Sequence, residues 1–206
     1  MLRIWGRISS INVQKVMFAV RELALPHERI DAGGAFGVVD TPSYLALNPN
    51  GLIPVLEEGD FVLWESNAIV RYLARLHGPG TLWPDDPQVA ADADRWMDWQ
   101  TTTLGPAMLA AFLNLIRLPA ERRDPAAVEA SVARTEKMID MLETRFSGSR
   151  HLCGDAFTMG DIAIACGVHR WLGLPCDKMA RPHLRRWYDT VMERPAVAGV
   201  LTLPIV

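Results

Sequence analysis

The stretch that decides the fold is residues 48–69, NPNGLIPVLEEGDFVLWESNAI. Its first four residues, Asn-Pro-Asn-Gly, form a strong turn signal. Two short apolar runs follow, over 53–57 and 61–64, and a Glu-Gly-Asp turn joins them, so we predict a tight antiparallel hairpin. Ser66 then stands where the cap of a helix is expected. The inward face of that helix is expected to carry Ile69, Val70, Leu73 and Leu76.

The residues before this stretch predict two strands and two helices. They are a strand over 2–5, a helix over 13–25, a strand over 28–31 and a short helix over 41–46. Ser10 or Asn12 is placed to cap the first helix, because a side-chain oxygen there can accept from its free N–H groups, and Pro26 is placed to end it. Thr41 is expected to cap the second helix. The order is therefore β-α-β-α-β-β-α, a thioredoxin-like topology.

The composition changes after the third predicted helix. Residues 77–88, HGPGTLWPDDPQ, carry three prolines and two glycines, which is typical of a linker. Beyond them only helical patterns remain, over roughly 89–116, 125–147, 159–172 and 181–193. The predicted fold class is α/β plus all-α: a thioredoxin-like domain over 1–78, a linker over 79–88 and an all-helical domain over 89–206.

The bulk composition excludes several classes of protein. The chain has 206 residues and a net charge of -3, whereas a nucleic-acid-binding surface usually needs a basic excess, so we expect no nucleic-acid partner. No apolar run reaches the ~18 residues of a membrane span, and residues 1–10, MLRIWGRISS, lack the apolar region and the cleavage site of a signal peptide. Cys153, Cys166 and Cys176 form neither a disulfide framework nor a zinc site, and five dispersed histidines suggest no metal centre. We therefore expect a cytoplasmic protein without a metal or a membrane partner.

The residues of 48–56 and 63–69 resemble the glutathione-binding half of the cytosolic glutathione transferases in residue type, spacing and position. The helical half also fits, so the resemblance covers the whole chain. It implies glutathione as co-substrate, a small hydrophobic electrophile bound by the helical domain, and a homodimer. Ile53-Pro54 stands where this family has a cis-proline, and a cis bond before proline costs only ~0.5–1 kcal/mol over trans.

Three parts of this stretch are expected to bind glutathione. The resemblance implies that the N–H and C=O of Ile53 pair with the cysteine peptide of glutathione, like an added strand. Taken alone, Pro54 would also fit a trans proline that starts an edge strand. Asn50 and Leu52 border the same position. Leu52 stands where many relatives carry Lys, Arg or Gln near the glycine carboxylate, so the group that holds this carboxylate stays open.

Glu65 and Ser66 are expected to hold the γ-glutamyl end. The Ser66 hydroxyl and the unpaired N–H groups of the first helical turn suit its carboxylate, and Glu65 can accept from its ammonium group. A serine cap beside a solvated glutamate explains Ser66 equally well.

The start of the first helix offers the candidates for activating glutathione. The glutathione thiol has a pKa of about 8.5, and lowering this pKa by about two units takes roughly 2.7 kcal/mol. A hydroxyl or amide that donates to the sulfur beside a helix N-terminus can supply that much. We assign Ser10 as the first candidate for the donor to sulfur and Asn12 as the second, with Ser9 as the alternative. Ser10 and Asn12 could instead serve only to cap the helix. No Tyr or Cys stands here, which disfavours the tyrosine-type and cysteine-type classes of the family. Ser10 falls on the hydroxyl position of the serine-type (theta) enzymes. The spacing Ser10-x-Asn12-x-x-Lys15 is also similar to a bacterial nu-type pattern.

The first helix of the second half offers the candidates for the electrophile site. They are Trp99, Thr103, Met108 and Phe112. Arg95 and Trp99 are also candidates for contact with glutathione, and core packing is the alternative for each residue. Further on, Thr158 and Asp161 match a capping box, which is similar to a structural motif of the family, so Asp161 is expected to be buried and hydrogen-bonded.

The resemblance therefore implies nucleophilic attack of a glutathione thiolate on an electrophile. Two alternatives stay open: glutathione-dependent reduction of disulfides or peroxides by the same fold, and a non-enzymatic binding or interaction module. A zeta-like isomerase is disfavoured, because that class has a Ser-Ser-Cys run and Ile11 follows Ser9-Ser10 here.

Overall fold

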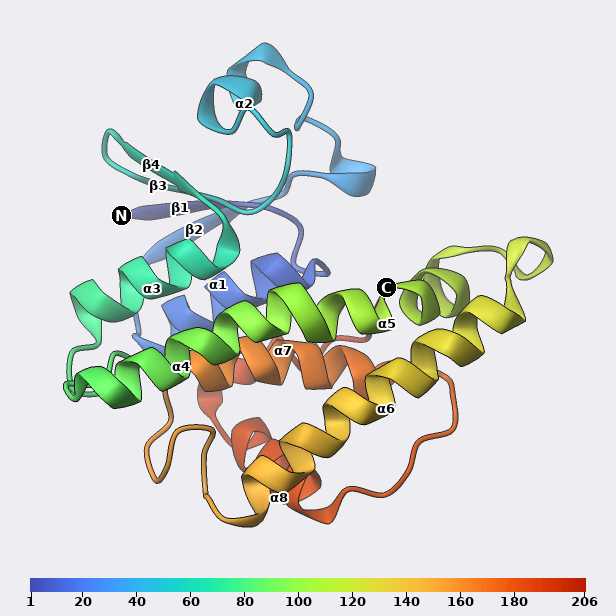
Figure 1. Cartoon of the computed structure of the whole chain (residues 1–206). Coiled ribbons are helices and arrows are strands. Elements are labelled where there is room, and N and C mark those ends of the chain that lie inside the picture. Colours follow the sequence, from blue (N-terminus) through green and yellow to red (C-terminus); the bar gives the residue numbers. More distant parts are fainter.

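The computed structural model describes residues 1–206 and shows a sheet-containing half and a helical half (Figure 1). The four strands have the order β2-β1-β3-β4. They are β1 (Leu2–Trp5), β2 (His27–Ile30), β3 (Val55–Glu58) and β4 (Phe61–Trp64). β1 runs parallel to β2 and antiparallel to β3, and β3 and β4 form the expected hairpin. The predicted thioredoxin-like order of elements is confirmed.

Helices cover the two faces of this sheet unequally. They are α1 (Ile11–Glu22), α2 (Pro42–Leu47) and α3 (Ser66–His77). α1 and α3 lie on the face toward the helical half, and α2 lies on the other face (Figure 1). Because side chains alternate along a strand, Leu2 and Ile4 enter the main core while Trp5 packs against Tyr44 of α2, with ring centroids 5.9 Å apart.

Some element ends differ from the predicted ones. α1 begins two residues earlier than predicted and ends at Glu22, well before Pro26. Ser66 is the first residue of α3 rather than its cap, and Glu65 takes the cap position with a φ of 71°. Leu76 is 53% exposed and does not belong to the inward face. The 3.6-residue period carries the buried stripe of α3 through Val70 and Ala74, which leaves Leu76 to one side of it.

The second half consists of helices, as predicted. They are α4 (Pro87–Trp99), α5 (Gly105–Phe112), α6 (Pro125–Ser147), α7 (Met159–Gly173) and α8 (Pro182–Met192). Two π-helical segments, Gln100–Leu104 and Leu113–Arg117, continue α4 and α5 into one long rod, and 3-10 turns lie at Gly34–Phe36, Ala120–Arg122 and Pro195–Val197. Asp86 caps α4 by accepting from the N–H of Gln88 at 2.7 Å, and Asp124 caps α6 by accepting from Ala127 at 3.1 Å.

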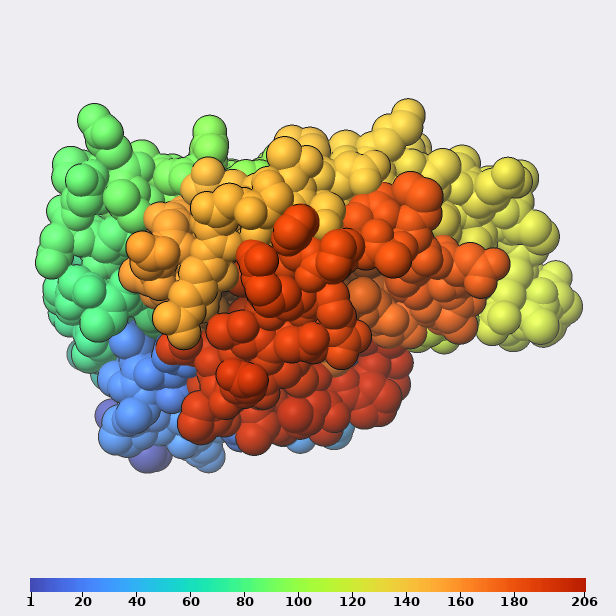
Figure 2. All heavy atoms as spheres, turned by 90° about the horizontal axis from the view of Figure 1, so that it is seen from below, coloured from blue at the N-terminus to red at the C-terminus, as the bar shows by residue number.

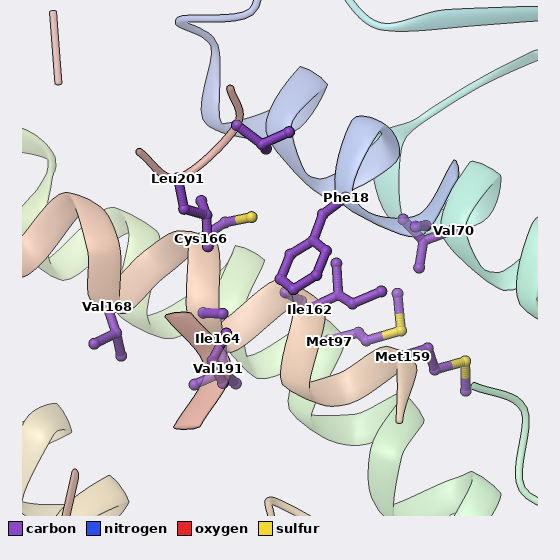
Figure 3. Close-up of a cluster of buried hydrophobic side chains, with 14 of the residues drawn as sticks. Phe18, Val70, Met97, Met159, Ile162, Ile164, Cys166, Val168, Val191 and Leu201 are labelled. Atoms are coloured by element: carbon purple, nitrogen blue, oxygen red, sulfur yellow. The ribbon is translucent and has the colours of Figure 1, made fainter. Parts of the chain in front are cut away.

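One continuous core runs through both halves. α7 lies in its centre, and every residue from Met159 to Val168 is buried. Phe18 of α1, Val70 of α3 and Ile162 of this helix belong to the same cluster of buried side chains (Figure 3). The two halves are therefore packed against each other as parts of one hydrophobic interior, which fixes the geometry between them.

The C-terminal segment strengthens this contact. Seen from below, the last residues spread over the helical half and reach the N-terminal residues (Figure 2). The side chain of Gln14 donates to the carbonyl of Val200 at 3.1 Å, and Arg194 pairs with Glu22 of α1. None of the helices is both long and apolar enough to span a lipid bilayer.

Candidate functional site

The loop between β1 and α1 places the predicted thiol-activating residues at the carboxyl end of β1, a central strand of the sheet. Gly6 has a φ of 145°, and a Cβ atom there would lie 2.4 Å from the Val13 side chain, so only glycine lets α1 pack this closely. Ser10 takes the cap position of α1, and its carbonyl accepts from Gln14 at 2.8 Å, but its hydroxyl makes no capping hydrogen bond. The Ser9 hydroxyl, in contrast, accepts from Arg7 at 2.9 Å.

The N-termini of α1 and α3 meet at Asn12 and Ser66. The hydroxyl of Ser66 donates to the side-chain oxygen of Asn12 at 3.3 Å, although the two residues are 54 positions apart. Ser66 is buried, whereas Asn12 and Glu65 are exposed. Both helices therefore present unpaired N–H groups and the positive end of their dipoles to the same place, which suits an anionic group.

Two side chains hold the backbone of the predicted peptide-binding loop by hydrogen bonds. The Ile53-Pro54 bond is cis, and neither the N–H nor the C=O of Ile53 takes part in a backbone hydrogen bond. The carbonyl of Leu52 accepts from the Tyr44 hydroxyl and from the Asn48 amide, each at 2.8 Å. Burial raises the pKa of Tyr44 to about 12, so it remains a phenol that donates.

Asn50 and Leu52 play different parts in this loop. The side-chain amide of Asn50 donates to Asn48 at 2.9 Å, so it is used within the turn. The Leu52 side chain is 63% exposed and offers no charge to a carboxylate. The structure thus brings Asn50 next to the loop as a turn residue and leaves the binding of a glycine carboxylate to other groups.

A cavity of about 220 Å³ lies between the two halves, directly beside Asn12. Its walls come from the first turns of α1, from the rod formed by α4 and α5, and from α7. The lining residues are Ile11, Asn12, Lys15, Gln100, Thr101, Gly105, Pro106, Met108, Leu109, Phe112 and Arg170. Met108 and Phe112, both expected at an electrophile site, are therefore brought to the same cavity as Asn12.

Two other residues expected at the electrophile site lie elsewhere. Trp99 lines a separate hollow of about 500 Å³ with Arg95 and Met141, and Arg95 pairs there with Asp92. Thr103 is absent from the cavity wall, where Thr101 stands instead. The π-helical segment Gln100–Leu104 adds a residue to one turn and so changes which side chains share a face. Neither residue is therefore part of the cavity beside Asn12.

Lys15 is a site residue that sequence reasoning did not assign. It is buried on α1, donates to Asn67 at 3.3 Å and to Thr101 at 3.4 Å, and forms no ion pair. Burial lowers the pKa of Lys15 to about 8, with smaller and partly opposing effects from Cys166 and Arg170. The available signal was its position on the first helix, between Val13 and the apolar run of residues 16–20.

The histidine of α7 and the predicted capping box have structural roles. His169 bonds to the Tyr188 hydroxyl at 2.8 Å and to the Leu203 carbonyl at 3.0 Å, while Trp171 is buried. Asp161 is fully buried and accepts from the backbone of Thr158. No three His, Cys, Asp or Glu side chains are grouped closely enough to hold a metal ion.

The fold and this site together define a class of protein. A thioredoxin-like domain carries a cis-proline loop and two helix N-termini that meet at Asn12 and Ser66, and a cavity between this domain and the helical domain lies beside Asn12. Comparison with known proteins agrees. Residues 9–76 match the family model described as glutathione S-transferase, N-terminal domain, and residues 104–195 match glutathione S-transferase, C-terminal domain.

Individual relatives match along the whole chain. The sequence is 43% identical over 207 residues to glutathione S-transferase GstB of Escherichia coli, with 100% of both proteins covered. The chain belongs to the glutathione S-transferase family. Among solved structures, the theta class glutathione S-transferase of Xanthomonas axonopodis pv. citri with glutathione bound matches with a TM-score of 0.96 and 38% identity, covering 100% of this chain and 99% of that one. Glutathione S-transferase I from maize, in complex with an atrazine glutathione conjugate, matches with a TM-score of 0.87 and 26% identity, covering 98% and 96%.

Proposed function

We propose that this protein is an enzyme that ionises the thiol of glutathione and directs the thiolate at a hydrophobic electrophile in the cavity between its two halves. The observation that carries the proposal is the position of Asn12, which contacts Ser66 of the peptide-binding side and also lines the cavity. One group thus lies between the two places where the reactants would bind. The glutathione bound in the Xanthomonas structure supports the same co-substrate.

Glutathione binds in this proposal at the loop that precedes β3, because β3 itself is paired on both sides, with β1 and with β4. The free N–H and C=O of Ile53, ahead of Pro54, pair with its cysteine peptide as an added strand would. The γ-glutamyl carboxylate lies at the N-terminus of α3 against Ser66, and Glu65 accepts from the ammonium group. Asn50 shapes the turn, and Leu52 borders the glycine end.

Ser10 and Asn12 stabilise the thiolate. The Ser10 hydroxyl is not used in capping, and the oxygen of Asn12 is occupied by Ser66, so its NH₂ group is left to donate to sulfur. Two donors beside a helix N-terminus are sufficient for the roughly 2.7 kcal/mol that a two-unit fall in the thiol pKa requires. The protein then contributes positioning and electrostatic stabilisation to the attack.

The electrophile occupies the cavity against Met108 and Phe112, both of which are buried. In this proposal Thr101, which lines the cavity, supplies the hydroxyl that was expected from Thr103, and Trp99 contributes to a separate hollow. We further propose a cytoplasmic homodimer that takes part in detoxification, uses no metal and binds neither nucleic acid nor membrane. The exposed Leu76 of α3 is a candidate for the dimer contact. α3 ends at His77 and α4 begins at Pro87. These ends support a thioredoxin-like domain over 1–78, a linker over 79–88 and a helical domain over 89–206.

Glutathione-affinity retention, thiolate absorbance and turnover of chlorodinitrobenzene test this function together. We expect the protein to be retained, to show thiolate absorbance of bound glutathione near neutral pH, and to form the dinitrophenyl conjugate. Absence of all three signals would identify a non-enzymatic relative. Retention with a thiolate signal, but with turnover only of a hydroxyethyl disulfide, would instead support the reductase activity that the Ser-x-Asn pattern keeps open.

A further inference from the structure

Three arginines from distant parts of the chain lie close enough to affect one another's charge, and one of them, Arg170, lines the cavity. Arg7 follows β1, Arg117 ends the second π-helical segment, and Arg170 belongs to α7. The guanidinium carbons of Arg117 and Arg170 lie 5.4 and 4.1 Å from the centre of the same ring, that of Phe112. Two cations therefore flank one aromatic side chain of the electrophile cavity.

These arginines have no acidic partner. None of the three forms an ion pair with a carboxylate, although many other arginines of the chain do. The lining of the cavity includes Lys15 and Arg170 and contains no Asp or Glu. This cleft is thus basic in a chain whose net charge is -3. Arg117 is exposed and Arg170 is half-buried, so an anion from solvent can reach both. A partly buried charge such as that of Arg170 is normally paired, and an anion supplied from outside would pair it.

The charged forms of Arg7 and Arg170 are both disfavoured in the folded chain. Burial lowers the pKa of Arg170 to about 10, with further contributions from Arg117 and Arg7. Burial, followed by repulsion from Arg117, lowers the pKa of Arg7. No carboxylate offsets this repulsion, so a bound anion would relieve it.

We propose that the electrophile site selects substrates that carry a carboxylate, with the apolar body of the substrate on Phe112 and its carboxylate at Arg117 and Arg170. The inference rests on the proposed glutathione transfer and specifies its substrate class. The guanidinium groups offset the repulsion between the thiolate and a second anion as the two approach. Sulfur forms a bond to the electrophilic carbon, the leaving group departs with its electron pair as halide, and the carboxylate is unchanged. The thiol proton has gone to solvent when the thiolate forms.

The same arginines are placed poorly for the carboxylates of glutathione itself. The cis-proline loop and the start of α3 belong to the thioredoxin-like half, whereas Arg117 and Arg170 lie on the helical half against Phe112. Arg7 lies on the glutathione side, where its side chain approaches Gly34, so it is left out of the test.

Two matched aryl halides test the proposal. A chlorodinitrobenzoate, with chlorine para to the carboxylate, and the corresponding uncharged benzamide undergo the same displacement and differ in charge. The readout is the ratio of kcat/KM for the benzoate to kcat/KM for the benzamide, because general damage to the enzyme cancels in it. Arg117→Gln and Arg170→Gln are each expected to lower this ratio roughly tenfold, the effect of one hydrogen bond to a charged group. Arg134→Gln removes an exposed arginine from α6 and is expected to leave the ratio unchanged.

An unchanged ratio in the double variant would overturn the inference, and so would an equal loss with both substrates. A rise in the KM for glutathione with a constant ratio would assign the arginines to glutathione and overturn it as well. Failure of the carboxylate site is separated from failure of the proposed function by calorimetry. The measurement compares the binding of unreactive dinitrobenzoate with that of dinitrobenzamide. If the wild type converts neither aryl halide, the transferase function fails, and the anion site is then upheld only if the benzoate binds more tightly and loses this preference in the double variant.

Discussion

At the start of α1, two neighbouring side chains are held in different ways. Ser10 occupies the cap position without a capping hydrogen bond from its hydroxyl, whereas Asn12 is oriented by Ser66. If Ser10 caps the helix, replacing it by alanine lowers stability and leaves activity intact. If Ser10 activates the thiol, the same replacement lowers activity and leaves stability intact. The structure therefore separates two roles that sequence reasoning had to leave together.

Ser10→Ala is expected to lower kcat/KM by one to two orders of magnitude, on the order of the loss of one preorganised donor to an oxyanion-like charge. The free energy of unfolding should change by much less than the ~1 kcal/mol that a lost N-cap costs, because no capping bond is removed. Urea unfolding and steady-state kinetics on the same preparation measure the two quantities. A loss of stability with kinetics intact would show that Ser10 is only a cap. Ser9→Ala is the comparison, and a larger kinetic effect there would move the assignment to Ser9.

Asn12→Asp tests the charge at the same place. The shape is nearly conserved and the oxygen can still accept from Ser66, but the donor is replaced by a negative charge beside the thiolate. We expect the pKa of bound glutathione to rise by at least about one unit, which corresponds to ~1.4 kcal/mol. The pH profile of kcat/KM reports this shift. An unshifted profile would mean that Asn12 does not face the sulfur.

The buried face of α1 carries the next prediction at the scale of an element. Burial lowers the pKa of Lys15 from the ordinary lysine value of 10.5 to about 8, so between these values the unfolded chain holds a proton that the folded chain has released. The contribution of Lys15 to the free energy of unfolding therefore rises with pH across this window, by at most about 1.4 kcal/mol per pH unit. Below about pH 8 the folded chain buries a charged ammonium group, and the free-energy cost of burying that charge is then fully present.

Lys15→Met is expected to remove this dependence. The difference in unfolding free energy between the variant and the wild type should shift in favour of the wild type from about pH 7 to about pH 10. Urea unfolding at several pH values measures it. Lys137→Met, which removes an exposed lysine from α6, should retain the wild-type slope. A constant difference for Lys15→Met would show that Lys15 titrates alike in both states.

The N-terminus of α7 depends on one carboxylate. Asp161 is fully buried and accepts from the N–H groups of Leu152 and Thr158 and from the indole of Trp187, each at 2.9 Å. Asp161→Ala leaves three buried donors unsatisfied, and we expect a loss of about 3 kcal/mol or more in unfolding free energy. Thermal unfolding measures the loss. Asp161→Asn keeps one acceptor and should lose less, whereas equal loss in both variants would show that charge, not hydrogen bonding, is what the site requires.

The elements show what sequence could predict and what it could not. Turn residues, apolar periodicity and the contiguous stretch 48–69 gave the order of elements, because these signals are local. The exchange of Thr103 for Thr101 in the cavity wall could not be foreseen, since a π-helical turn leaves no mark in apolar spacing. The burial of Lys15 and the meeting of Arg117 with Arg170 depend on packing between segments far apart in sequence. Contacts of this kind become visible only in the folded chain.

At the scale of the whole molecule, the glutathione side and the electrophile side are joined by a shared interior. Phe18 of α1 is fully buried and packs against Phe157 of the helical half, with ring centroids 5.7 Å apart. α1 therefore carries the thiol-activating residues at one end and a contact with the helical half along its length. A cavity built between two halves keeps its shape only if the halves do not move independently.

Phe18→Ala tests this coupling. Removing a buried phenylalanine side chain should cost about 3–5 kcal/mol, and because the core is continuous the protein should still unfold in a single transition. Coincident urea curves from tryptophan fluorescence and circular dichroism would show one transition, and hydrogen exchange should report the same loss of protection in β1 and in α7. Tyr44→Phe is the matched control, because Tyr44 belongs to the small cluster on the far side of the sheet and loses only its hydrogen bond to Leu52, worth about 1 kcal/mol. Two separated transitions in Phe18→Ala would mean that each half folds by itself, and the cavity would then depend on how the halves happen to dock.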